Sequence, residues 1–124
     1  MKILITGGAG FIGSALIRYL IGKKYINVVN VDVLTYAANT KSLNKVKNSD
    51  LYVFEQIDIC DLKKLEYIFK KYTPDKVIHL AAETHVDNSI VSPDNFISSN
   101  IWGTYNLLKI SKTYWEKLDS VRKK

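Results

Sequence analysis

A glycine-rich turn near the N-terminus does most to limit what this chain can fold into. The apolar run Lys2–Thr6 leads into Gly7, Gly10 and Gly13, and a helix is predicted over Ser14–Ile21. A strand, spaced glycines and a helix in this order are typical of the βα turn that holds a dinucleotide pyrophosphate. The free N–H groups and the positive dipole end of such a helix favour phosphate oxygens.

Each glycine has its own predicted role in that turn. Gly7 can turn the chain sharply, because glycine tolerates positive φ. Gly10 lets the backbone approach the pyrophosphate, and Gly13 lets the helix pack tightly on the strand. Glycines also mark ordinary turns, so the motif needs support from elsewhere in the chain.

The second predicted strand supplies that support. Asn27–Val31 ends at Asp32, nineteen residues after Gly13. An acidic residue about 20 positions beyond the glycines accepts hydrogen bonds from the adenosine ribose hydroxyls. Its carboxylate repels a 2′-phosphate, and Val33 beside it offers no charge to hold one. We therefore predict NAD rather than NADP; the alternative is that Asp32 is only a polar strand terminator.

The rest of the chain alternates predicted strands and helices, which indicates an α/β fold. Strands are predicted at Leu51–Gln56 and Lys76–Leu80, and helices at Asp61–Tyr72 and from Pro93 to about Leu118. Residues 34–50 are an insertion that could include a short helix, and residues 81–92 are predicted to be irregular. Right-handed crossovers then give a Rossmann-like, doubly wound parallel sheet with strand order 3-2-1-4.

A complete sheet of this kind has at least a fifth and a sixth strand. We therefore expect residues 1–124 to be the N-terminal part of an NAD-binding Rossmann domain, without its later strands and without a substrate domain. The fourth strand should then be an open sheet edge, which favours association unless something covers it.

Composition limits the classes of partner. The net charge is +6, but sixteen of the eighteen basic residues are lysines spread over presumed helix surfaces, which argues against a nucleic-acid interface. No apolar run approaches the length of a membrane span and no signal peptide is recognised, so we expect a cytoplasmic protein. The single cysteine, Cys60, has no metal-ligand spacing around it, and no metal site is predicted.

Several segments resemble a known family. Ile3–Gly13 resembles the opening of the extended short-chain dehydrogenase/reductases. Within that superfamily Val31–Ala37, Asp58–Asp61 and His79–Asp87 resemble the dTDP-glucose 4,6-dehydratases, and the resemblance covers nearly the whole chain. It implies NAD as cofactor and dTDP-glucose as substrate. It also implies hydro-lyase chemistry, in which hydride leaves carbon 4, water is eliminated across carbons 5 and 6, and hydride returns to carbon 6.

The resemblance also implies a set of site residues. Phe11 and Ile12 would offer backbone N–H groups to the pyrophosphate, the residues from Asp32 would surround the adenosine ribose, and Asp58 with Ile59 would contact the adenine. The complete predicted cofactor set is Gly7, Gly10, Phe11, Ile12, Gly13, Asp32, Val33, Leu34, Thr35, Asp58, Ile59, Leu80, Ala81, Ala82, Glu83, Thr84 and Ser99. Thr84 is predicted to bind substrate as well.

This sequence departs from the family pattern at a few positions. Thr84 stands for a usual serine, Asn88 for an arginine and Ala38 for a glycine. In the family the helix that begins near Pro93 helps to form a homodimer, so its apolar surface is expected to serve as interface as well as core.

No catalytic residue is predicted in this chain. The family's Tyr-x-x-x-Lys and Asp-Glu pairs come after the fifth strand, and the lysine lowers the tyrosine pKa toward working pH. The same spacing occurs here as Tyr19 with Lys23, Tyr67 with Lys71, Tyr72 with Lys76 and Tyr105 with Lys109. Eight tyrosines and sixteen lysines make this spacing common, and all four pairs precede the expected fifth strand. We therefore expect no turnover by this chain alone.

Two other hypotheses stay open at this stage. One is another NAD-dependent nucleotide-sugar enzyme, such as a UDP-hexose 4-epimerase or a different sugar dehydratase. The other is a non-catalytic chain that binds a dinucleotide or a partner, for instance by pairing its open sheet edge with a separately encoded second half.

Overall fold

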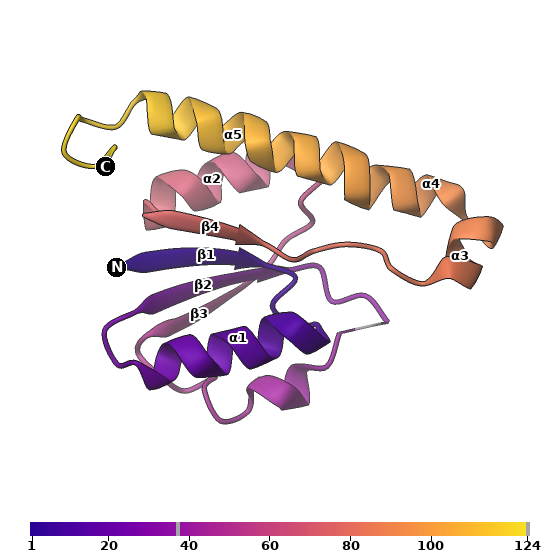
Figure 1. Ribbon diagram of the computed structural model, residues 1–124, viewed down its shortest axis with the longest axis horizontal. Coiled ribbons are helices and arrows are strands. Elements are labelled where there is room, and N and C mark those ends of the chain that lie inside the picture. The colour runs from indigo at the N-terminus through magenta and orange to yellow at the C-terminus, as the bar shows by residue number, and fades with distance from the viewer. Residues whose placement is uncertain (37, 124) are drawn as a thin grey trace.

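Four parallel strands form one sheet with helices on both faces in the computed structural model (Figure 1). The structure describes residues 1–36 and 38–123, so Ala37 of the Val31–Ala37 segment and the C-terminal Lys124 lie outside the described residues. The strands are β1 Lys2–Thr6, β2 Asn27–Asp32, β3 Tyr52–Gln56 and β4 Lys76–His79. The helices are α1 Phe11–Gly22, the 3₁₀ turn η1 Thr40–Leu43, α2 Leu62–Tyr72, α3 Val86–Val91, α4 Pro93–Phe96, the π-helical η2 Ile97–Gly103 and α5 Thr104–Glu116.

The strand order is β3-β2-β1-β4, which confirms the predicted Rossmann-like arrangement. β1 lies inside the sheet, with Ile3 opposite Val28 of β2 and Lys76 of β4. A strand between two neighbours and two helical layers must be apolar on both faces, and four of the five residues of β1 are buried. This explains why the apolar run at the N-terminus reads as continuous rather than alternating.

The sheet separates two hydrophobic cores. On one face Leu4 and Val31 pack with residues of α2 and α5, where the rings of Phe69 and Tyr114 lie 5.3 Å apart. On the other face Ile5 packs with α1 through residues such as Ile17. Alternate residues of one strand therefore serve opposite layers.

Three predicted boundaries need correction. The first helix begins at Phe11 rather than Ser14, because Gly10 occupies its N-cap and Gly13 lies inside its first turn. Residues 86–91, predicted to be irregular, form the short helix α3. The helix that begins at Pro93 is interrupted by the π-helical segment η2 and ends at Glu116.

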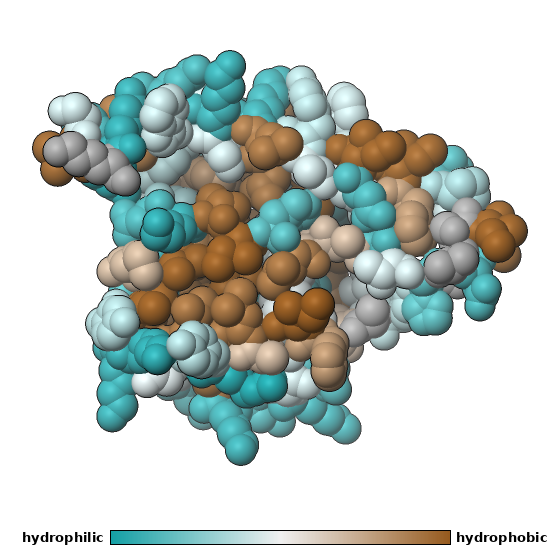
Figure 2. All heavy atoms as spheres, in the orientation of Figure 1, coloured by the Kyte–Doolittle hydropathy of each residue, from teal (hydrophilic) through white to brown (hydrophobic). Residues whose placement is uncertain are grey.

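One sheet edge is open, as predicted. Within the described residues β4 pairs only with β1. Figure 2 shows hydrophobic side chains gathered over β1 and β4, between α1 and α5. Ile78 and Leu80 are only partly buried there. No helix among residues 1–36 and 38–123 is long and apolar enough to cross a bilayer.

Candidate functional site

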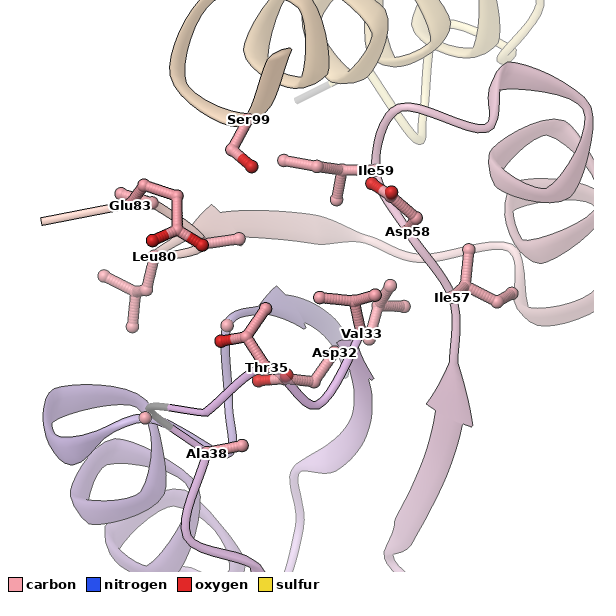
Figure 3. A pocket seen from close by; sticks show the side chains of 15 residues that line it. Asp32, Val33, Thr35, Ala38, Ile57, Asp58, Ile59, Leu80, Glu83 and Ser99 are labelled. Atoms are coloured by element: carbon pink, nitrogen blue, oxygen red, sulfur yellow. The ribbon is translucent and has the colours of Figure 1, made fainter. Parts of the chain in front are cut away.

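A cavity of about 100 Å³ lies at the carboxyl ends of the strands, where loops from all four meet (Figure 3). In parallel α/β sheets ligands bind in the crevice outside these strand ends. The cavity is lined by Gly7, Gly10, Val31, Asp32, Val33, Thr35, Ala38, Ile57, Asp58, Ile59, Leu80, Ala81, Ala82, Glu83 and Ser99. Most of the predicted cofactor residues are thus brought together around one space.

The glycine turn forms one wall of this cavity. Gly7 has φ +71°, and a Cβ on it would lie 2.5 Å from the backbone nitrogen of Ala81. A Cβ on Gly13 would lie 2.3 Å from the Gly7 carbonyl oxygen. Gly10 is the N-cap of α1 and has no side chain to cap the helix. The first turn therefore keeps backbone N–H groups that an anion can satisfy, which fits a pyrophosphate.

Asn30 lies beneath the turn and shows why Gly8 is also required. A Cβ on Gly8 would lie 2.1 Å from Asn30 Oδ1. The amide is fully buried, and its Nδ2 donates to the hydroxyl of Tyr52 at 3.0 Å. Burial raises the pKa of Tyr52 above its ordinary value. Within the described residues Oδ1 has no hydrogen-bond partner, so close packing against Gly8 sets its position.

Asp32 is the acidic group at the floor of the cavity. Its side chain is mostly buried, Oδ2 accepts the Ala9 N–H at 2.8 Å, and Oδ1 accepts the Leu34 N–H at 2.8 Å. Leu34 takes the left-handed conformation, with φ +62°. A carboxylate offers about four acceptor sites, so each oxygen keeps capacity for a hydroxyl donor. Asp32 therefore joins the glycine turn to the loop after β2 and can still receive ribose hydroxyls.

Side chains of the long helix hold the opposite wall. Asn100, in the π-helical segment, accepts the Glu83 N–H and donates to the Glu83 carbonyl, both at 2.8 Å. Asn106 of α5 donates to the carbonyls of Ile59 and Cys60. π-Helical segments occur frequently at functional sites. Here one helix fixes the loops that follow β3 and β4.

His79 connects the strands to the same helix. Its Nδ1 lies 2.6 Å from Thr6 Oγ1, and its Nε2 lies 2.9 Å from Thr104 Oγ1. Thr6 Oγ1 also accepts the N–H groups of Leu80 and Ala81 at 3.3 Å. The Thr6 hydroxyl therefore donates its single proton to His79 Nδ1, which must be unprotonated to accept it. The proton of the neutral imidazole is then on Nε2, which donates to Thr104 Oγ1. Burial lowers the pKa of His79, which favours this neutral form.

A second cavity of about 480 Å³ adjoins the first and shares Val33, Thr35, Asp58, Glu83 and Ser99 with it. The Tyr36 hydroxyl donates to Glu83 Oε2 at 3.3 Å from the other side of this space. Cys60 lines it, and burial, together with Asp58, raises the pKa of the thiol to about 11. The thiol is therefore protonated near neutral pH, which agrees with a packing role rather than a nucleophilic one.

Five predicted residues do not line the first cavity. Phe11 and Ile12 lie exposed on the first turn of α1, Gly13 packs behind the turn, Leu34 contributes its N–H to Asp32, and Thr84 is exposed on the loop after β4. Val31, Ala38 and Ile57 line the cavity without having been predicted. Val31, near the end of β2, and Ile57, directly after β3, lie at the carboxyl ends of strands, and that position could have predicted them, whereas Ala38 lies further along the loop after β2.

The four Tyr-x-x-x-Lys pairs lie apart from the cavity, since none of their eight residues is in its lining. Lys23 lies over the ring of Tyr19, 4.6 Å from its centre, on the outside of α1. Lys71 and Tyr72 both bind Glu55 at the sheet edge. Within the described residues no group of three or more His, Cys, Asp or Glu could hold a metal ion.

Comparison with known proteins agrees with this geometry. The family model described as GDP-mannose 4,6 dehydratase matches residues 4–123. The dTDP-glucose 4,6-dehydratase of Haemophilus influenzae is 57% identical over 123 residues, which are 99% of this chain and 36% of that protein. The predicted resemblance to dTDP-glucose 4,6-dehydratases is confirmed. The chain spans about a third of the length of this relative.

Solved structures give the same result for the fold. The dTDP-glucose 4,6-dehydratase of Streptomyces venezuelae, crystallised with NAD bound, matches with a TM-score of 0.85 and 37% identity, covering 92% of this chain and 36% of that chain. The UDP-glucose 4-epimerase of Thermotoga maritima, solved with UDP-glucose, matches with a TM-score of 0.81 and 37% identity, covering 92% of this chain and 35% of that chain.

Proposed function

The chain belongs to the family described as GDP-mannose 4,6 dehydratase, and from this premise we propose that it binds NAD as the dinucleotide-binding part of a dTDP-glucose 4,6-dehydratase. The observation that carries the proposal is Asp32. Its carboxylate lies at the cavity floor, hydrogen-bonded to the N–H of Ala9 in the glycine turn. This hydrogen bond holds the glycine turn, which would bind the pyrophosphate, next to the carboxylate that would accept the ribose hydroxyls.

The residues present fit NAD at both of its characteristic groups. The uncapped first turn of α1, including Phe11 and Ile12, offers N–H groups to the pyrophosphate. Asp32 accepts ribose hydroxyls and repels a 2′-phosphate. The loop that carries Asp58 and Ile59 would contact the adenine, and Leu80–Thr84 with Ser99 would line the rest of the cofactor site. NAD supplies hydride transfer when bound; these residues bind and orient it.

We assign the substrate from the relatives and from two loops. The dehydratase of Streptomyces venezuelae and the UDP-glucose 4-epimerase of Thermus thermophilus are both solved with NAD, so NAD binding does not select a substrate. The segments 34–37 and 83–87, together with 57% identity to a dTDP-glucose 4,6-dehydratase, favour dTDP-glucose. Thr84 offers its hydroxyl to that substrate. The catalytic acid-base groups are proposed to lie outside residues 1–124, and the cytoplasmic location stays a prediction.

We propose that the long helix from Pro93 binds a second copy of the whole protein. Its outer surface exposes Ile97, Ile101, Trp102, Tyr105 and Leu108. Figure 2 shows hydrophobic side chains along this part of the surface. Exposed apolar groups that follow one helix face are typical of an interface.

Titration calorimetry of the 124-residue protein with NAD and NADP tests the proposed function. We expect saturable NAD binding and NADP binding weaker by at least about tenfold, because the 2′-phosphate meets Asp32. No heat at millimolar NAD would overturn the proposal. Formation of a 4-keto-6-deoxy sugar from dTDP-glucose by this protein alone would overturn the placement of the catalytic groups outside it.

A further inference from the structure

Asn106 of α5 is buried at the point where the helix meets the loop after β3. Its side chain is 3% exposed, and Nδ2 donates to the carbonyl oxygens of Cys60 at 3.0 Å and Ile59 at 3.4 Å. Asparagine is mostly exposed in proteins, and burying an amide is unfavourable unless it is hydrogen-bonded. Both bonds reach one short loop, so this amide fixes where that loop lies.

The loop is held on its other sides as well. Asp58 Oδ1 accepts the Cys60 N–H at 2.8 Å, and Cys60 Sγ donates to the Ser98 carbonyl at 3.2 Å. Gly103 allows the closest approach, since a Cβ there would lie 2.6 Å from Ile59 Cδ1. Ser98, Gly103 and Asn106 of the helix therefore contact this loop, and among these three Asn106 alone donates to its carbonyl oxygens.

The same loop presents Asp58 and Ile59 to the cavity (Figure 3). A carboxylate only accepts hydrogen bonds, so Asp58 matches the 6-amino group of adenine and opposes the 6-oxo group of hypoxanthine. The preference depends on where the carboxylate lies, because a hydrogen bond weakens steeply with poor distance or angle. Loop position and base preference are therefore linked.

We propose that Asn106 is a positioning residue that sets the preference of this cavity for adenine, by fixing the loop that carries Asp58 and Ile59. The inference rests on the proposed NAD binding. It concerns a residue that lines neither cavity and acts only through the backbone of its neighbours.

The first experiment is amide hydrogen exchange on the 124-residue protein without nucleotide. Asn106→Leu removes both donors at similar volume. We expect the Cys60 and Asp61 amides to exchange at least about tenfold faster than in the wild type, while β1 amides follow the overall stability. Ile68→Val, a buried change on α2, is the control for general destabilisation. Equal protection of the loop in both variants would overturn the inference.

The second experiment compares dissociation constants for NAD and nicotinamide hypoxanthine dinucleotide. The wild type and Ile68→Val should prefer NAD by about tenfold, and Asn106→Leu should lose most of that preference. If Asn106→Leu does not fold, Asn106→Ala, which removes the same Nδ2 donors with a smaller side chain, should lower the ratio. NAD binding with an unchanged ratio in the variant overturns the inference alone. Absence of NAD binding by the wild type overturns the proposed function and, with it, the selectivity role.

Discussion

On one wall of the cavity the backbone itself sets the shape, whereas on the other wall a distant helix does so through its side chains. The first wall consists of the glycine turn and the loop after β2, joined by the two N–H groups that Asp32 accepts. The second consists of the loops after β3 and β4, fixed by Asn106 and Asn100. In the glycine turn the contacts that limit substitution are steric, because a Cβ on Gly7 or Gly13 meets backbone atoms, whereas two asparagine side chains fix the loops after β3 and β4 by hydrogen bonds.

This difference predicts where a substitution should be severe. A Cβ on Gly7 meets backbone atoms of Leu80 and Ala81, directly after β4, and a Cβ on Gly13 meets backbone atoms of the turn itself. A side chain removed from the second wall leaves carbonyls and N–H groups that water can partly satisfy. Changes in the first wall should therefore act on folding and binding together, and changes in the second mainly on local order.

Gly7→Ala should have the largest effect. The alanine would take a left-handed conformation with its Cβ against Ala81, and we expect a loss of about 2–4 kcal/mol of unfolding free energy. Urea denaturation followed by circular dichroism measures it. Gly22→Ala is the matched control, since a Cβ there meets nothing within 4 Å, and it should stabilise by about 0.5–1 kcal/mol. Equal effects of the two changes would contradict the steric account.

Asn100→Leu should have the next largest effect. It removes both hydrogen bonds to the backbone of Glu83, and we expect a loss of about 2 kcal/mol in the same denaturation experiment. Amide exchange should also rise in the loop after β4. Asn48→Leu, at an exposed turn, should change stability by no more than about 0.5 kcal/mol. A loss no larger than that of Asn48→Leu would contradict the role assigned to these two hydrogen bonds.

Gly103→Ala tests how closely the helix packs on the loop after β3, and it should lower the unfolding free energy by about 1 kcal/mol. The added Cβ meets the outer carbons of the Ile59 side chain, which can rotate, rather than backbone atoms. The double variant with Ile59→Val should recover part of the loss, because valine lacks the Cδ1 methyl. Thermal unfolding of the two proteins measures the difference, and no recovery would show that backbone crowding dominates.

The smallest expected effect is a pH dependence at His79, which contacts both Thr6 of β1 and Thr104 of α5. Burial lowers its pKa below the ordinary value of about 6.5, so the unfolded chain binds more protons in acid. Its contribution is complete above about pH 6.5 and is lost as the pH falls through the folded pKa. His79→Gln should give a shallower stability decline from pH 6.5 to 5, by under about 1 kcal/mol. Equal slopes of unfolding free energy against pH for the wild type and His79→Gln would contradict this role of His79.

The same contrast explains what the sequence could predict. The glycine turn, Asp32 and the strand order follow from local spacing and alternation, and they were predicted correctly as structure. The clamp of Asn100 on Glu83 joins positions seventeen residues apart through a π-helical segment. No local pattern signals that change of helical register, since the same residues are compatible with a continuous α-helix.

Two local features were also missed for physical reasons. The α1 start at Phe11 was hidden by Gly10 and Gly13, because glycine lowers helix propensity even where a helix begins. Six residues of α3 are too few to show a helical period. The packing of Asn30 under Gly8 depends on the neighbouring strand, and only the folded sheet brings the two together.

The position of β1 has a consequence for the order in which the protein assembles. Thr6 pairs with His79, 73 residues later, and the loop after β4 contributes Leu80 and Ala81 to the cavity. Closing so long a loop costs chain entropy before the new contacts repay it. The cavity is therefore completed only when the last strand docks, and a nucleotide can stabilise the finished sheet without guiding the earlier steps of its folding.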